Sequence, residues 1–279
     1  MKIYHGLKGL GDNIYQRAFV KALPKPFYLQ TPWPELYEDI DGVYCTRPRT
    51  TLRTQSKNIE KYKHWHVEPV GRAISVQYGR EGIVPGMRHC FGVAPAPMDL
   101  PDFGRVQCSR PYAVVRPVTQ RREWLAQSRS PKPEYVAEAA DVLRSEGYLV
   151  VSVADLQDGE EWAESPLPHA DLQYHHGELN VRQLLALIQH ASIAVGGVGW
   201  IVPAAIAAKV PAWIINGGNG GFNAQEKITD PRMDLSRIVF ARPDKFCKCF
   251  QSTHTCDKVI SNHADKFTEW IRKLPDLVA

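Results

Sequence analysis

The sequence has 279 residues and lacks a long uninterrupted apolar run, which argues against a membrane-spanning helix. Its longest apolar stretch, IVPAAIAAKVPAWII, is broken by two prolines and a lysine. The first residues, MKIYHG, contain no apolar leader, so we expect a cytoplasmic protein without a transmembrane segment. A hydrophobic content of 44% with 23% charged residues is typical of a folded globular chain.

The sequence also lacks a strong net charge and a secreted-type disulfide pattern. A formal net charge of +4 is compatible with phosphate-bearing ligands but too small to indicate nucleic-acid binding by itself. Six cysteines in a chain of this length do not predict a disulfide framework. The segment CKCFQSTHTC does offer four zinc-type ligands, but its Cys-x-Cys spacing is tighter than usual, so a zinc site stays open: Cys247, Cys249, His254 and Cys256.

Two common phosphate-binding motifs are absent from the glycine-rich start, YHGLKGLGDNIYQRAFVKAL. Its glycines occur as Gly6-x-x-Gly9-x-Gly11, which differs from the dinucleotide fingerprint, and the next predicted strand, PFYLQT, does not end in an acidic residue. No Gly-Lys-Ser/Thr sequence completes a P-loop. A short strand therefore leads through a glycine turn into a helix predicted over 12–23, with Asp12 at its start.

The second half of the chain alternates predicted strands and helices, whereas the first half is irregular. The later strands, such as YAVVRP, YLVVSV and SIAVGG, are apolar throughout, which predicts a parallel sheet covered on both faces. Ligands of such sheets bind beyond the carboxyl ends of the strands. Because glycine, basic and aromatic residues follow several of these strands, we expect a nucleotide site in the second domain. The proline-rich segment 95–111 is interpreted as an interdomain linker.

Several segments resemble the ADP-heptose:lipopolysaccharide heptosyltransferase-like glycosyltransferases (glycosyltransferase family 9-like). The resemblance rests on GLGDNIYQRAFVKAL, on VVRPVTQRREW, on ELNVRQLLALIQHASIAVGGVGWIVPAAIAAKVPAWIING and on the cysteine-containing tail. It implies an α/β fold of the GT-B architecture, in which two Rossmann-like domains face a central cleft. We accordingly expect an acceptor-binding domain at 1–108, a nucleotide-sugar-binding domain at 109–262, and a C-terminal helix at 263–279 that packs back on the first domain.

The resemblance also implies a role for the aspartate of the glycine turn. Asp12 takes the position of the family's proposed general base, which deprotonates the acceptor hydroxyl in an inverting, metal-independent transfer. A helix N-terminus and its backbone N–H groups are expected to hold this carboxylate ionised. The alternative is that Asp12 only caps the helix, since Asp is a favoured capping residue. We expect Lys8, Asn13 and Gln16 nearby to contact the acceptor.

For the donor, we expect basic and glycine residues at the strand ends of the second domain. Thr119, Arg121 and Arg122 are the candidates for the diphosphate, and Gly196, Gly197 and Gly199 would allow close backbone approach. The family's Asp-Ser-Gly triplet is replaced by Val198-Gly199-Trp200, so ADP-heptose does not carry over and the nucleobase and sugar stay open. Further donor contacts are expected from Trp200, Asn216, Gly217, Glu226 and Lys227. No metal and no cofactor besides the nucleotide-diphosphate sugar are expected, because "DLQD" is spaced wrongly for an Asp-x-Asp motif.

The acceptor and even the activity stay open at this point. The resemblance implies a bacterial surface glycan or lipopolysaccharide-type acceptor. A hydroxymethylated base in DNA is an alternative, because the first domain contains a run of basic residues: Arg47, Arg49, Arg53, Lys57, Lys61 and Lys63. A nucleotide-sugar-binding protein without transferase activity is another, motivated by the missing Asp-Ser-Gly triplet.

Overall fold

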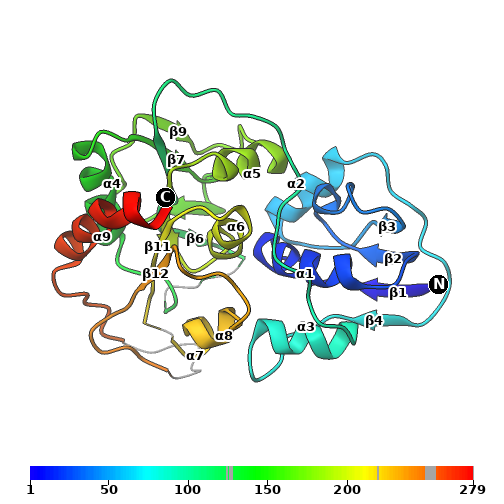
Figure 1. Ribbon diagram of the computed structural model, residues 1–279. Helices are drawn as coiled ribbons and strands as arrows, with labels where there is room; N and C mark the ends of the chain where they lie inside the picture. The colour runs from blue at the N-terminus through cyan, green and yellow to red at the C-terminus, as the bar shows by residue number, and fades with distance from the viewer. Residues whose placement is uncertain (124, 126–127, 219, 249–255, 279) are drawn as a thin grey trace.

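Two parallel sheets, each with its own helices, lie side by side in the computed structural model (Figure 1), which describes all residues except 124, 126–127, 219, 249–255 and 279. The first sheet has the order β3-β2-β1-β4, and all of its described pairings are parallel. Its strands are β1 (Lys2–His5), β2 (Phe27–Gln30), β3 (Val43–Thr46) and β4 (Ala73–Ser75). The accompanying helices are α1 (Leu10–Ala22), η1 (Pro34–Leu36), α2 (Arg53–Lys61) and α3 (Ile83–Phe91).

Alternation along the first strands places one apolar face against α1 and α3. Tyr4 and Phe27 are buried on this face with ring centroids 5.5 Å apart, and Tyr4 also contacts Phe91 of α3. Phe19 of α1 stacks on Phe91 at 5.4 Å. These aromatic contacts fix α1, and with it the glycine turn, against the sheet.

The second sheet has the order β12-β11-β10-β5-β7-β9 with parallel pairings throughout, as the apolar strands predicted. Its strands are β5 (Tyr112–Val115), β7 (Leu149–Val153), β9 (Leu172–Tyr174), β10 (Ile193–Gly197), β11 (Ala212–Ile215) and β12 (Ile238–Ala241). A small antiparallel pair lies beside it, β6 (Thr119–Arg121) with β8 (Glu161–Ala163). The helices are α4 (Pro133–Ser145), α5 (Val181–Gln189), α6 (Ile201–Ala208), α7 (Gly220–Asn223), α8 (Gln225–Ile228) and α9 (His263–Val278).

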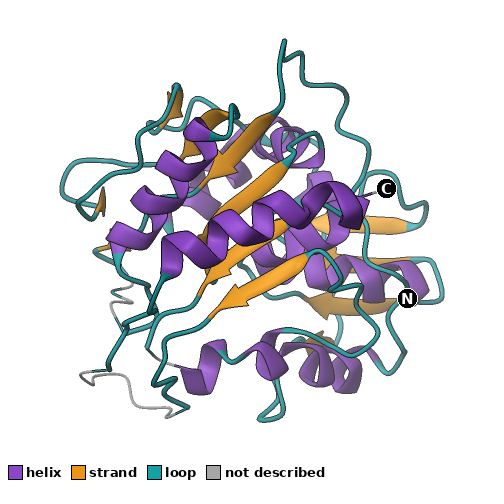
Figure 2. Cartoon of the chain, turned by 60° about the vertical axis from the view of Figure 1, so that its left-hand side comes forward, coloured by secondary structure: helices purple, strands orange, loops and turns teal. Residues whose placement is uncertain are grey.

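The C-terminal helix α9 packs on the second domain, and the prediction that it returns to the first domain was wrong. Figure 2 shows this long helix lying across the second sheet. Its apolar stripe joins the core of that domain, where Phe267 and Trp270 contact Trp213 of β11. His263 accepts a hydrogen bond from Trp213 Nε1 at 3.1 Å and pairs with Glu138 of α4 at 2.9 Å. These partners lie on the second domain, so they keep the helix there.

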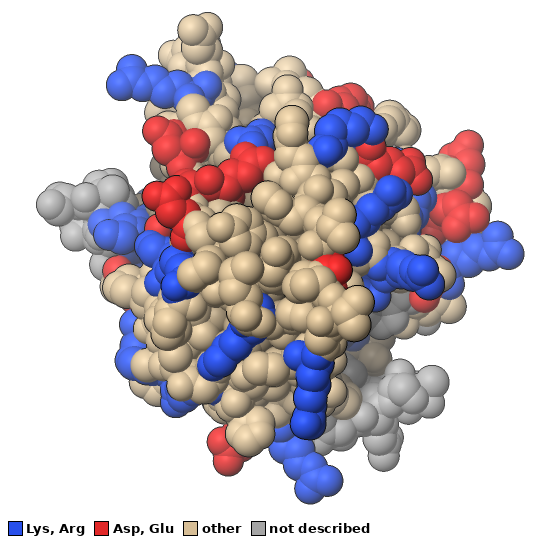
Figure 3. All heavy atoms as spheres, turned by 90° about the vertical axis from the view of Figure 1, so that its right-hand side faces the viewer, with Lys and Arg blue, Asp and Glu red and all other residues tan. Residues whose placement is uncertain are grey.

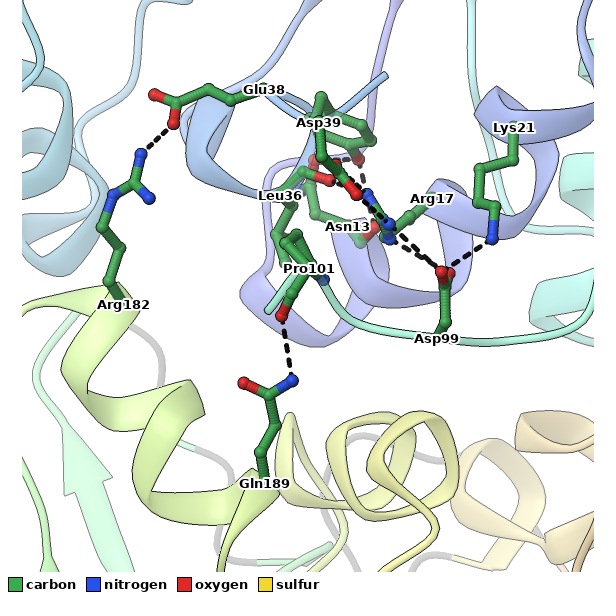
Figure 4. A network of polar contacts seen from close by, with 11 residues as sticks. Asn13, Arg17, Lys21, Leu36, Glu38, Asp39, Asp99, Pro101, Arg182 and Gln189 are labelled. Carbon is green, nitrogen blue, oxygen red and sulfur yellow. Dashed lines mark hydrogen bonds and ion pairs between the residues drawn. The ribbon is translucent and has the colours of Figure 1, made fainter. Parts of the chain in front are cut away.

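Polar contacts join the domains along the linker that crosses between them (Figure 4). Arg17, whose side chain is only 2% exposed, pairs with Asp39 and with Asp99 of the linker. Gln189 of α5 donates to the Pro101 carbonyl at 2.9 Å, and Arg182 of α5 pairs with Glu38. Within the described residues, no helix is long and apolar enough to cross a membrane.

The His263 contact predicts a pH-dependent stability. Burial lowers the pKa of His263, so the unfolded chain takes up a proton more readily than the folded one. The resulting stabilisation is complete above about pH 6.5 and is lost as the pH falls through that value. In urea unfolding between pH 5 and 8, His263→Gln should flatten this dependence, and His169→Gln, at an exposed histidine, should retain it. An unchanged slope in His263→Gln would contradict the assignment.

Candidate functional site

The glycine turn after β1 is held by buried amides that the sequence had suggested for acceptor contacts. Asn13 and Gln16 are both fully buried. Asn13 Nδ2 donates to the carbonyls of Leu7 and Gly9, at 2.7 and 2.8 Å, and Gln16 Oε1 accepts from the Leu7 N–H at 3.1 Å. The expectation that these two residues contact the acceptor is therefore corrected: their side chains are used to fix the turn.

The turn brings the N-terminal end of α1 against the N-terminal end of α6 in the other domain. A Cβ atom on Gly11 would lie 3.0 Å from Trp200 Cα, so a larger residue would crowd this approach. Trp200 is the N-cap of α6 and packs partly buried at the interface, and its contact with a donor stays a prediction. Both helices thus direct the positive ends of their dipoles into one region.

Asp12 lies in this region, at the third position of α1, and the N-cap is Gly9 instead. Its carboxylate lies against the Gly9 backbone. Burial is the largest influence on Asp12 and raises its pKa above the usual value, while the polar groups of Gly9 and Tyr78 and the charge of Arg129 oppose that rise. The expectation that the helix end dominates is thus corrected: desolvation is the larger effect, and it suits a proton acceptor.

Arg116 and Arg129 of the second domain supply positive charge beside the α6 N-terminus. Arg116 directly follows β5, and a Cβ atom on Gly199 would lie 3.4 Å from its Nη1. Within the described residues Arg116 forms no ion pair; it donates to Thr119 Oγ1 at 3.3 Å. Burial and the neighbouring Arg121 and Arg129 lower its pKa to about 10, which leaves it charged at neutral pH. Arg129 donates to the Val198 carbonyl at 3.2 Å.

The three residues predicted to bind a diphosphate differ in their exposure and in their partners. Thr119 contacts Arg116 and belongs to the cluster. Arg121 pairs at 2.9 Å with Glu161, a carboxylate whose side chain is only 2% exposed, so much of its charge is offset. Arg122 is 72% exposed and lies 3.5 Å from Glu160, away from this cluster.

The remaining predicted donor residues are also dispersed. Gly196 and Gly197 end β10, and a Cβ atom on Gly196 would lie 3.2 Å from Arg116 Cβ. Asn216 is buried directly after β11, where its Nδ2 donates to the Asn223 carbonyl, and Gly217 packs against the Arg129 backbone. At α8 the two charged residues have other partners: Glu226 pairs with Lys248 at 3.0 Å, and Lys227 donates to the Arg80 carbonyl at 2.7 Å.

The basic run proposed to contact DNA is partly used between the domains. Arg53 of α2 pairs with Asp155 and with Glu161 of the second domain, at 3.2 and 2.9 Å, and Lys57 pairs with Asp155 at 2.9 Å. Lys8, expected at the acceptor, is exposed and donates to the Arg49 carbonyl. Figure 3, which shows the first domain from outside, has basic side chains interspersed with acidic and uncharged ones. A continuous basic surface is not seen on that face.

Two of the four predicted zinc ligands fall outside the described part of the chain. Cys249 and His254 are not among the described residues, and only Cys247 and Cys256 can be placed. A Cβ atom on Gly218 would overlap the Cys256 side chain, so this tail lies directly against the loop after β11. Among the described residues, no group of three metal-ligating side chains is present.

Comparison with solved structures identifies the fold. The chain is similar to the heptosyltransferase TibC in complex with ADP-D-beta-D-heptose, at 14% identity. That likeness covers 100% of this chain and 79% of TibC, with a TM-score of 0.65. It is similar to the Escherichia coli ADP-heptose lps heptosyltransferase II at 14% identity, covering 100% and 99% of the two chains with a TM-score of 0.57. It is also similar to the E. coli heptosyltransferase WaaC with ADP-2-deoxy-2-fluoro heptose, at 11% identity. That likeness covers 98% of this chain and 100% of WaaC, with a TM-score of 0.55.

The fold is therefore that of the heptosyltransferases, which confirms the predicted GT-B architecture. No protein-family model matches the chain, and no curated protein matches its sequence significantly. At these identities the likeness establishes the fold alone, and the chemistry has to be argued from the residues in the cleft.

Three residues of the cleft were not predicted from the sequence. Arg116 stands at the end of a predicted strand, and the strand-end rule that selected Thr119 applied to it equally. Arg129 and Tyr78 lie in irregular loops, where sequence periodicity carries no information on which side chains face Asp12. Their assignment depends on the packing of the two domains.

This arrangement predicts that the α6 N-terminus binds a diphosphate group. Inorganic pyrophosphate should bind in calorimetry at low salt, and Arg116→Gln should weaken it by roughly 10- to 100-fold, as expected for one lost charge-assisted hydrogen bond. Arg122→Gln, at an exposed arginine outside the cluster, should have little effect. Equal losses in both variants would point to nonspecific charge attraction.

Proposed function

We propose that this protein is a glycosyltransferase that moves a sugar from a nucleotide-diphosphate sugar to an acceptor hydroxyl with inversion at the anomeric carbon. The observation that carries the proposal is that Asp12 lies where the N-terminal ends of α1 and α6 meet, with the charge of Arg129 acting on it and Arg116 beside Gly199. A proton acceptor and a diphosphate-binding group on opposite walls of one cleft are what such a transfer requires. The heptosyltransferase fold supports the same reaction class.

In the proposed reaction, the acceptor O–H gives its proton to the Asp12 carboxylate as its oxygen bonds to the anomeric carbon. The bond between that carbon and the phosphate oxygen breaks, and its electron pair leaves with the nucleoside diphosphate. Attack from the face opposite the leaving group inverts the configuration. Arg116, Arg129 and the α6 dipole would stabilise the departing negative charge, in the place of a divalent cation.

In this proposal the sugar and the base of the donor differ from those of ADP-heptose. The segment Val198-Gly199-Trp200 has no side-chain carboxylate or hydroxyl to contact a sugar, and Trp200 packs against α1. Asn216 and Asn223 are buried after β11, and each has a polar atom without a partner among the described residues. These amides are candidates for contacts with the nucleobase, which would be set by this loop.

For the acceptor we propose a glycan hydroxyl. The similar structures include the E. coli ADP-heptose lps heptosyltransferase II. The DNA alternative loses its main support because Arg53 and Lys57 pair with carboxylates of the second domain. The Asp12 variant described below distinguishes a transferase from a nucleotide-sugar-binding protein without activity.

The donor is tested by thermal unfolding with ADP, UDP, GDP, TDP and CMP, each with magnesium and with EDTA. A ligand at a hundredfold over its dissociation constant adds about 2.7 kcal/mol to the free energy of unfolding. One nucleoside diphosphate should raise the melting temperature equally with and without metal, and Arg116→Gln should reduce that rise to about half or less. A shift that requires magnesium would contradict the metal-independent proposal.

Replacing Asp12 with Asn tests the base. Asp12→Asn keeps the size of the side chain but cannot take a proton, so sugar transfer should fall by about 10²- to 10⁴-fold with little change in nucleotide binding. Transfer is measured as nucleoside diphosphate released from the donor identified above. Turnover at the wild-type rate would mean that Asp12 only stabilises the helix end.

A further inference from the structure

The antiparallel pair β6 and β8 places a buried carboxylate opposite one of the predicted diphosphate residues. Arg121 of β6 and Glu161 of β8 are register partners, and Arg121 Nε lies 2.9 Å from Glu161 Oε2. Within the part of the chain that the structure describes, none of the Arg121 N–H groups is aligned for a hydrogen bond. The side chain is 25% exposed, so these donors are open to a ligand.

The alternation of side chains along β6 directs Arg121 toward the proposed diphosphate site. Arg121 and Thr119 are two residues apart and face the same side of the strand, whereas Gln120 between them is buried on the other side. Thr119 accepts a hydrogen bond from Arg116, which lies beside Gly199 at the N-terminal end of α6. Arg121 therefore adds a second guanidinium group to that side of the strand pair.

The first domain reaches the same carboxylate through Arg53, the first residue of α2, which lies on the side of that domain facing the second (Figure 1). Arg53 Nη2 donates to Glu161 Oε2 at 2.9 Å and to the Asp155 backbone carbonyl. Arg53 Nη1 lies 3.2 Å from the Asp155 carboxylate. The backbone N–H of Arg53 donates to the Glu123 carboxylate at 3.2 Å. One residue of the first domain thus contacts three carboxylates of the second.

Glu161 Oε2 is consequently shared between two guanidinium groups, and its single negative charge is divided between them. The Glu161 side chain is only 2% exposed, so water cannot replace a lost partner. Without Arg53, the only cation that contacts this carboxylate among the described residues would be Arg121, and its charge would be offset completely. Arg53 therefore keeps part of the Arg121 charge available to another anion.

We propose that Arg53 is a positioning residue for the donor diphosphate: by sharing Glu161 from the first domain, it leaves the Arg121 guanidinium to bind a phosphate in bidentate fashion. Donor affinity would then depend on the docking of the two domains, although Arg121 itself belongs to the second. The inference rests on the proposed function for the identity of the donor, whereas the contacts of Arg53 do not depend on it.

Calorimetry of the full-length protein with inorganic pyrophosphate at low salt tests the proposal. Arg121→Gln should weaken binding by roughly 10- to 100-fold, because a charge-assisted contact is lost. Arg53→Gln should weaken it by about 3- to 10-fold, because Glu161 then offsets the charge of Arg121. Lys57→Met is the matched control: it removes a positive charge and an interdomain pair with Asp155 from the same helix, and it should change the Kd by less than about twofold. Equal losses in Arg53→Gln and Lys57→Met would overturn the proposal.

A double-mutant cycle separates positioning through Glu161 from a direct effect of the Arg53 charge. In a Glu161→Gln background no carboxylate is shared, so Arg53→Gln should change the Kd no more than Lys57→Met does. The same loss in both backgrounds would overturn the role of Glu161. A wild type that does not bind pyrophosphate would overturn the proposal together with the phosphate site.

Transfer kinetics give the second readout. Arg53→Gln should raise the donor KM by about the factor seen in calorimetry and leave the acceptor KM unchanged, because only the binding of the donor is affected. An acceptor KM raised to the same extent would mean that Arg53 merely holds the domains together, and would contradict the proposal. A wild type that binds pyrophosphate but transfers no sugar would refute the proposed function, and the calorimetric cycle would still decide the role of Arg53.

Discussion

The N-terminal ends of α1 and α6 meet at Gly11 and Trp200, and this contact between domains determines the electrostatics of the cleft. Two positive helix ends and the guanidinium groups of Arg116 and Arg129 gather in one place. Asp12 is the carboxylate that faces them there. A site built in this way attracts further negative charge, and a diphosphate supplies it in a form that guanidinium groups bind well.

Apolar residues of both domains pack in one core cluster, and polar contacts around it also join the domains. Arg17 with Asp39 and Asp99 fixes the linker, Arg53 with Glu161 joins α2 to the second domain, and Lys227 donates to the Arg80 carbonyl. Buried charged groups of this kind stabilise little by themselves but are costly to leave unpaired, so they favour one relative placement of the domains.

Sequence reasoning was most successful where a pattern is local. The apolar strands of the second half predicted a parallel sheet, and the glycine turn predicted a helix start near Asp12. It was wrong for Asn13 and Gln16, because a polar residue beside a turn can as well be buried to hold it. It was wrong for α9, whose amphipathic pattern shows that one face is buried but not against which domain.

The rest of the site depends on contacts between residues far apart in the chain. The charge of Arg129 acts on Asp12 only because the two domains dock, and no periodicity or spacing encodes that meeting. Arg121 was predicted to bind the diphosphate because it lies at a strand end. In the structure Glu161 pairs with Arg121 and offsets its charge. Charge balance, like docking, is a property of the folded chain.

The most direct test of the account is a crystal structure with the nucleoside diphosphate that the protein binds best. The diphosphate oxygens should contact the Arg116 guanidinium at the N-terminal end of α6, with the β-phosphate on the side that faces Asp12. A diphosphate bound at the exposed Arg122, or outside the cleft between the two domains, would contradict the proposed site and the transfer chemistry built on it.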